Sequence, residues 1–182
     1  GNTSFYQILL KKKNKLKIYL QLIDLLLKIQ KIKLQTRLKS IIKKKHLIEE
    51  YSLKHLVKES DLFFDFYLPL LFNKKKVLNI KKKTKKVLLK IYKKIYLSNS
   101  CFVHRDFHVQ NLMKVGKNVG VIDSQDALIG NPAYDLVSII DDVRIKTPTK
   151  LKNQIYDYYL KKKYKSYKKE HKKFLQDFNI LS

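Results

Sequence analysis

The 182-residue sequence is poor in cysteine, glycine and long apolar runs, and each shortage excludes something. Its single cysteine, Cys101, excludes an internal disulfide and is typical of a protein from a reducing compartment. Only four glycines are present, and none forms the glycine-rich loop that cradles phosphates. No membrane span is expected, because charged residues interrupt the most apolar stretch, Leu16–Ile29, well short of the ~18 residues that a span requires.

Basic residues are in large excess over acidic ones. Lysine and arginine total 41 against 15 aspartates and glutamates, which gives a formal net charge of +26. Such a charge favours a nucleic acid, an anionic membrane or an acidic ligand as partner. Only three of the 41 basic residues are arginines, however, and it is arginine that grips phosphates and guanine edges with a planar fork. We therefore expect no specific nucleic-acid partner and attribute the lysine excess to the codon bias of an AT-rich genome, with a selected polyanion site as the alternative.

Outside residues 101–145, apolar residues recur at spacings of three and four, which predicts amphipathic helices. A basic break at Lys39–Lys45 separates the first two helical regions, and Pro69 is expected to bend or end the second. The aromatic residues of that second region are expected to lie in a core. The predicted helical regions are Asn14–Leu34, Leu47–Phe72, Val77–Leu97, Pro148–Tyr167 and Glu170–Leu181, and a further helix, Tyr134–Ile145, is predicted within residues 101–145.

The period changes after Ser100. A short apolar strand at Phe102 and Val103 precedes the polar loop HRDFHVQN, and two further short strands are predicted at Asn111–Val115 and Val119–Asp123. The intervening Gly-Lys-Asn has the composition of a three-residue hairpin loop. If that loop is centred on Lys117, Asn111 faces Asp123, with Cβ atoms about 4.5–5.5 Å apart. The sequence therefore predicts a carboxamide oxygen beside a carboxylate at the open end of the hairpin.

Two oxygen ligands on a rigid hairpin suit a hard cation such as Mg²⁺, which keeps several waters and takes further ligands from substrate phosphates. Asp106, in the loop just upstream, can orient a hydroxyl group and accept its proton. Metal ions across the phosphates and a positioned acceptor are what phosphoryl transfer requires. The alternative is a surface hairpin with polar ends, and the spacing His-x-Asp-x-x-x-x-Asn followed by Val-Ile-Asp favours the catalytic interpretation.

HRDFHVQN followed by GVIDSQDALIGNPAYDLVS resembles the catalytic core of the aminoglycoside phosphotransferase and choline kinase-like superfamily, which shares its fold with protein kinases. Within it, the stretch is most similar to bacterial sugar kinases that phosphorylate N-acetylmuramate and N-acetylglucosamine at the anomeric position in cell-wall recycling. Their pattern, HRDxHxxNLM and then GVIDFQDAxxGPxxYDLVSLLxD, differs here at Ser124 and Asn131. A weaker similarity covers Glu59–Leu68 and the opening GNTSFYQIL, so that the resemblance spans most of the chain.

The resemblance also implies roles for single residues. Asp106 would be the catalytic base, and Asn111 and Asp123 would bind Mg²⁺. The remaining candidates are supporting residues or substrate contacts: His104 as a brace of the catalytic loop, Arg105 in a local ion pair or on the substrate, His108 as support or substrate contact, Asp126 as a polar contact near the metal or a turn former, and Asp135 as a structural acceptor for the loop backbone.

We predict a mostly helical α+β fold over residues 1–182, the C-terminal lobe of a protein-kinase-like fold with a small catalytic hairpin. Its reaction would transfer the γ-phosphoryl group of ATP, with Mg²⁺, to a hydroxyl of a small molecule, an amino sugar first of all, in the cytoplasm. The alternatives are a kinase for an aminoglycoside, choline or another small alcohol, and a non-catalytic lysine-rich scaffold for nucleic acid or an anionic membrane.

Three parts of a kinase-like site are missing from the sequence. These are the glycine-rich loop over the ATP phosphates, the strand lysine that contacts them and the glutamate that pairs with this lysine. We expect the N-terminal ATP-binding lobe to lie upstream of Gly1 and the C-terminus to be truncated. The isolated chain is then expected to have little or no kinase activity.

Overall fold

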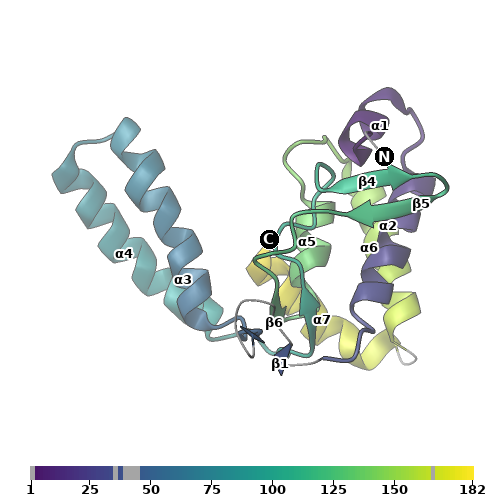
Figure 1. Ribbon diagram of the computed structural model, residues 1–182. Coiled ribbons are helices and arrows are strands. Elements are labelled where there is room, and N and C mark those ends of the chain that lie inside the picture. Colours follow the sequence, from purple (N-terminus) through teal and green to yellow (C-terminus); the bar gives the residue numbers. More distant parts are fainter. Residues whose placement is uncertain (1–2, 35–36, 39–45, 165–166) are drawn as a thin grey trace. The chain divides into compact units, whose positions relative to one another are not determined.

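The structure is a computed structural model that describes residues 3–34, 37–38, 46–164 and 167–182 (Figure 1). It divides into two compact units, and each is described by itself. Unit 1 comprises residues 1–50 and 97–182, and unit 2 comprises residues 51–96. The basic break predicted at Lys39–Lys45 lies outside the described residues.

The described part of unit 1 consists of helices and short antiparallel strand pairs, which confirms a mostly helical α+β fold. The helices are α1 (Phe5–Lys11), α2 (Leu16–Ile29), α5 (Tyr134–Ile140), α6 (Thr149–Lys163) and α7 (Tyr167–Leu181). The strand pairs are β1 (Arg37–Leu38) with β2 (His46–Leu47), β3 (Cys101–Val103) with β6 (Leu128–Gly130), and β4 (Leu112–Val115) with β5 (Asn118–Val121).

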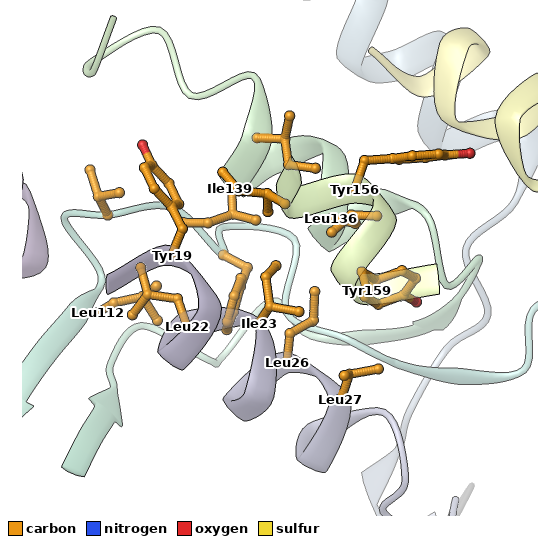
Figure 2. Close-up of a cluster of buried hydrophobic side chains, with 14 of the residues drawn as sticks. Tyr19, Leu22, Ile23, Leu26, Leu27, Leu112, Leu136, Ile139, Tyr156 and Tyr159 are labelled. Atoms are coloured by element: carbon orange, nitrogen blue, oxygen red, sulfur yellow. The ribbon is translucent and has the colours of Figure 1, made fainter. Parts of the chain in front are cut away.

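Helix α2 supplies the centre of the core of unit 1. Its apolar residues at spacings of three and four lie on one face, and that face packs against α5 and α6 (Figure 2). Burying one such side chain contributes ~1.5–3 kcal/mol, so α5 is firmly anchored. The fully buried residues at this junction include Tyr19, Leu22, Ile23 and Leu26 of α2, Leu136 and Ile139 of α5, and Tyr159 of α6.

The predicted first helix ends earlier than expected, at Ile29, and the side chain of its C-cap residue, Gln30, forms hydrogen bonds with other elements. The Gln30 side chain is buried, donates from Nε2 to the Pro132 carbonyl at 3.0 Å, and accepts from the Tyr159 hydroxyl at 2.7 Å. These bonds tie the end of α2 to α6 and to the segment just before α5. The buried amide therefore acts as a polar tie within an otherwise apolar interface.

A second polar tie joins α7 to the ends of the β3–β6 pair. The fully buried Asp177 carboxylate accepts from the Leu97 backbone N–H and from Asn131 Nδ2, each at 2.7 Å. Asn131 Oδ1 in turn accepts from the Ala133 N–H at 2.9 Å. Asn131, one of the two departures from the kinase pattern, thus forms structural hydrogen bonds through both its amide nitrogen and its amide oxygen.

Unit 2 is a pair of antiparallel helices (Figure 1), made of α3 (Leu53–Leu62), a π-helical turn (Phe63–Tyr67), a 3-10 turn (Leu68–Leu70) and α4 (Lys74–Tyr92). Pro69 lies in the 3-10 turn, where the first helical segment ends as predicted. The prediction that the aromatic residues form a core was wrong for most of them. Phe64 is buried with Leu68 and Val77, whereas the side chains of Phe63, Phe66 and Tyr67 are 49%, 72% and 53% exposed. The cause is geometric, because a two-helix pair buries only one narrow face of each helix.

Candidate active site

The catalytic hairpin is one residue out of the predicted register. Val115 pairs with Asn118 and Leu112 with Val121, so the loop has the two residues Gly116 and Lys117 rather than three. Gly116 has φ +57°, and glycine at the first position of a two-residue loop suits the backbone twist of a hairpin. The predicted three-residue loop was wrong because Asn118 is extended and joins the ladder.

The register change alters how Asn111 and Asp123 meet. The Ile122 N–H donates to the Asn111 carbonyl at 3.1 Å, so that Ile122, and not Asp123, continues the ladder opposite Asn111. Asp123 follows directly with φ +68°, in the left-handed region that few residues other than glycine adopt. Gln125 Nε2 donates to Asp123 Oδ1 at 2.5 Å. The carboxylate is therefore next to the end of the ladder, on a turn, and is not a cross-strand partner of Asn111.

His104 connects the start of the catalytic loop to the end of β5. Its ring Nε2–H donates to the Ile122 carbonyl at 3.0 Å, and its side chain is almost completely buried. Burial lowers the pKa of His104, while the nearby Asp106 and Asp123 carboxylates oppose that shift. The lowered pKa of His104 favours the neutral ring, which suits a supporting donor.

Asp135, in the first turn of α5, fixes the beginning of the loop. Its two carboxylate oxygens accept the backbone N–H groups of His104, at 2.8 Å, and of Arg105, at 3.1 Å. Burial raises the pKa of this fully buried carboxyl to about 7, and the two backbone hydrogen bonds oppose the shift. These are the contacts that the resemblance implied for Asp135.

Arg105 has an unusual backbone conformation, with φ +74°. In the described residues, the only non-glycine positions with positive φ are Arg105 and Asp123, and both belong to the candidate site. Strained backbone of this kind is concentrated at functional sites. Arg105 Nη1 donates to the backbone carbonyl of Asp126 at 3.4 Å, which connects the loop to the segment after Asp123.

Asn111 is oriented by its own loop. Its Nδ2 donates to the Asp106 carbonyl at 3.1 Å and lies 3.5 Å from His108 Nε2. Among the residues that the structure describes, no donor reaches Asn111 Oδ1 or the half-buried Asp106 carboxylate. Two oxygen groups of one loop are thus held in place and left open to a ligand.

The donor set fits a magnesium ion. Asn111 Oδ1, the exposed Asp123 carboxylate and the nearby Asp106 are oxygen donors, which Mg²⁺ prefers. The described residues contain no group of three or more His, Cys, Asp and Glu side chains that could enclose a metal by themselves. A cation held here would therefore keep waters or phosphate oxygens as its other ligands, as Mg²⁺ does in phosphoryl-transfer sites.

Two residues of this site were not predicted. Asp142 and Arg144, just after α5, form hydrogen bonds to the distal end of the catalytic loop at Val109 and Gln110. A sequence signal existed for the first of them, because the sugar-kinase pattern YDLVSLLxD ends at the position of Asp142.

The loop-and-hairpin arrangement agrees with the family resemblance of the sequence. A family model described as the phosphotransferase enzyme family matches residues 10–169, and the chain belongs to that family. The resemblance to its sugar kinases is also confirmed. The N-acetylmuramate/N-acetylglucosamine kinase of Neisseria meningitidis serogroup B is 29% identical over 100 residues, which cover 55% of this chain and 30% of that kinase. The proteins of the same name from Pseudomonas aeruginosa and Caulobacter vibrioides are 45% identical over 47 residues and 40% identical over 48 residues.

The matched stretches cover less than a third of these relatives, namely 30%, 14% and 13% of their lengths. In the described part of the chain, none of the helices has the length and apolar content that a membrane crossing requires.

Proposed function

We propose that this chain supplies the acceptor- and metal-binding half of a kinase that transfers the γ-phosphoryl group of ATP to a hydroxyl of a small molecule. The observation that carries the proposal is the state of the catalytic loop. Its backbone is bonded to buried partners at His104, Arg105 and Val109, yet the Asp106 carboxylate and Asn111 Oδ1 accept no hydrogen bond from the described residues. Rigid backbone with open oxygen groups is what a preorganised catalytic site requires.

The roles follow from chemistry and position. Asp106 orients the acceptor hydroxyl and takes up its proton as the hydroxyl oxygen bonds to the γ-phosphorus. The bond from the γ-phosphorus to the β,γ-bridging oxygen breaks, and ADP leaves. Asn111 Oδ1 and the Asp123 carboxylate hold Mg²⁺, which neutralises charge on the phosphates when bound. His104 keeps the loop and the end of β5 together through Ile122. Arg105, His108 and Asp126 remain candidates for substrate or supporting contacts.

The substrate proposed is an amino sugar such as N-acetylmuramate or N-acetylglucosamine, and the proposed compartment is the cytoplasm. Support comes from the names of the similar kinases and from the resemblance of the HRDxHxxN and VID spacing in this chain to the sugar-kinase pattern. Because a glycine-rich loop and a strand lysine are missing from the sequence, we assign ATP binding to an N-terminal lobe and this chain to the C-terminal lobe.

The test is a transfer assay on the protein that contains this chain together with its ATP-binding lobe. Labelled ATP and Mg²⁺ are supplied with N-acetylmuramate, N-acetylglucosamine, choline or an aminoglycoside, and label on the acceptor is measured. We expect label on an amino sugar and, for Asp106→Asn, a rate about 10²–10⁴-fold lower. Asp141→Asn is the control, because Asp141 pairs with Lys152 of α6 and, among the described residues, forms no hydrogen bond to the loop.

Label on choline or an aminoglycoside alone would replace the proposed substrate and keep the reaction class. An Asp106→Asn variant as active as the wild type would contradict the proposed role of Asp106. No transfer to any acceptor, combined with polyanion binding that weakens steeply with salt and ignores Mg²⁺ and ATP, would favour the lysine-rich scaffold instead.

A further inference from the structure

We propose that Asp142 and Arg144 position the metal-binding end of the catalytic loop, as a second brace that complements Asp135. This inference rests on the proposed function, because it assigns the brace to the site of Asn111. Asp142 Oδ2 accepts the Val109 N–H at 3.1 Å, and its side chain is fully buried. Arg144 completes the brace, because it forms an ion pair with Asp142 and a hydrogen bond with Gln110 of the loop.

The Arg144 side chain is held in one orientation because two of its guanidinium nitrogens donate to two different acceptors. Its Nη1 donates to Asp142 Oδ1 at 3.2 Å, and its Nε donates to Gln110 Oε1 at 3.0 Å. Its backbone N–H also donates to Asp142 Oδ1, at 3.0 Å. The side chain thus links Gln110 of the loop to the buried carboxylate. A lysine has a single terminal nitrogen and no planar fork, so it is expected to hold these two acceptors less firmly.

The two braces come from opposite ends of one anchored helix. Asp135, in the first turn of α5, holds the loop at His104 and Arg105, whereas Asp142, just past its last turn, holds the loop at Val109. The loop between them contains Asp106. Because α5 is packed into the core, both ends of the loop are attached to the same rigid helix.

Val109, which Asp142 holds, is two residues from the proposed metal ligand Asn111, and His108 connects the two. The Asn111 backbone N–H donates to the His108 carbonyl at 3.0 Å, and its side-chain Nδ2 lies 3.5 Å from His108 Nε2. His108 directly precedes the residue that Asp142 fixes. Loss of the brace would therefore free the turn that orients the Asn111 amide, and outer contacts of this kind change metal affinity by about 10- to 100-fold.

The composition of the chain supports a specific use of arginine here. Of 41 basic residues only three are arginines, and two of these, Arg105 and Arg144, form bonds at the catalytic loop. In a chain so rich in lysine, a guanidinium at this position fits a role that depends on the fork and not on charge alone.

The experiment measures Mn²⁺ affinity of the full 182-residue chain by the electron paramagnetic resonance signal of free Mn²⁺, with amide hydrogen exchange at Val109 as a second readout. The variants are Arg144→Lys, Asp142→Asn and Gln110→Ala, and the matched control is Asp141→Asn, one residue from Asp142 with its own cation, Lys152. We expect Arg144→Lys to weaken Mn²⁺ binding about 10-fold and to speed exchange at Val109, and Asp141→Asn to leave both within twofold.

Asn111→Ala and Asp123→Asn separate the two proposals. If both abolish Mn²⁺ binding while Arg144→Lys leaves it within twofold of the wild type, the brace is refuted and the metal site stands. If neither ligand variant changes Mn²⁺ binding, the proposed metal site is refuted and the brace with it. Arg144→Lys keeps the charge, and Gln110 is exposed, so these variants test the brace even if Asp142→Asn does not fold.

Discussion

Replacing Asp135 by alanine tests whether the catalytic loop depends on the helix beneath it. The variant removes a fully buried acceptor and leaves the N–H groups of His104 and Arg105 without a partner. A buried donor left unsatisfied costs ~1–3 kcal/mol, so the two together predict a loss of about 3 kcal/mol near pH 5. For a domain of this size that corresponds to a melting temperature lower by about 6–12 °C.

The effect of Asp135→Ala is expected to depend on pH. Burial raises the pKa of Asp135 to about 7 from an ordinary value of 3.8. The folded state therefore binds the proton more tightly than the unfolded state, and the stability that this residue contributes is complete below pH 3.8 and is lost as the pH rises through about 7. Alanine has no ionisable side chain, so the difference in free energy of unfolding between the wild type and Asp135→Ala becomes smaller over this pH range.

The assay is thermal unfolding by circular dichroism at pH 5, 6, 7 and 8, with amide hydrogen exchange at His104 and Arg105. Asp141→Ala is the control, because its ion pair with Lys152 is partly exposed and is expected to contribute about 1 kcal/mol or less. A variant as stable as the wild type at pH 5, or a gap that widens towards pH 8, would refute the assignment of Asp135 as a buried brace.

Two further predictions concern the hairpin and the histidine. Gly116→Ala is expected to cost ~1–2 kcal/mol in urea unfolding because φ is +57°, although nothing lies within 4 Å of the added Cβ. Gly120 has no positive φ, and a Cβ there would lie 3.0 Å from Val115 Cγ2 and 3.8 Å from the Met113 carbonyl oxygen, so Gly120→Ala is expected to cost less through a small shift of Val115. The reverse order would contradict the turn assignment. Burial lowers the pKa of His104 below 6.5, so its contribution to stability is present above pH 6.5 and is lost as the pH falls through the lower pKa of the folded state. In His104→Gln, the free energy of unfolding should therefore fall less steeply as the pH decreases below 6.5. An unchanged slope would show that the pKa of His104 does not differ between the folded and unfolded states.

Most helices of this fold could be predicted from periodicity, but helix α1 and the ends of the other helices could not. Helix α5 was expected to run from Tyr134 to Ile145 but ends at Ile140, because the Asp142 side chain accepts the Arg144 N–H and turns the chain. Helix α1 was missed, although Ser4 and Gln7 form a capping box that the spacing Ser-x-x-Gln could have indicated. Both cases depend on a local side-chain hydrogen bond and not on apolar period.

The residues of the site could be nominated from sequence, but their geometry could not be derived. The Gly-Lys-Asn composition allows both a two-residue and a three-residue loop, and the choice between them decides which residue faces Asn111. The contact between Asp142 and Val109 joins positions 33 residues apart, so no local pattern reveals it. The family resemblance nominated the acids of the site, and the structure supplied the hydrogen bonds that hold the loop backbone around them.

The most direct test of the central claim is the position at which Mn²⁺, as a substitute for Mg²⁺, binds this chain, measured from the broadening of backbone amide signals in nuclear magnetic resonance spectra. The account predicts that broadening at low Mn²⁺ is centred on Asp106, Asn111 and Asp123, and that it disappears in Asp123→Asn. Broadening centred on other acids, such as Asp61 and Asp65 of unit 2, with the catalytic loop unaffected, would contradict the account.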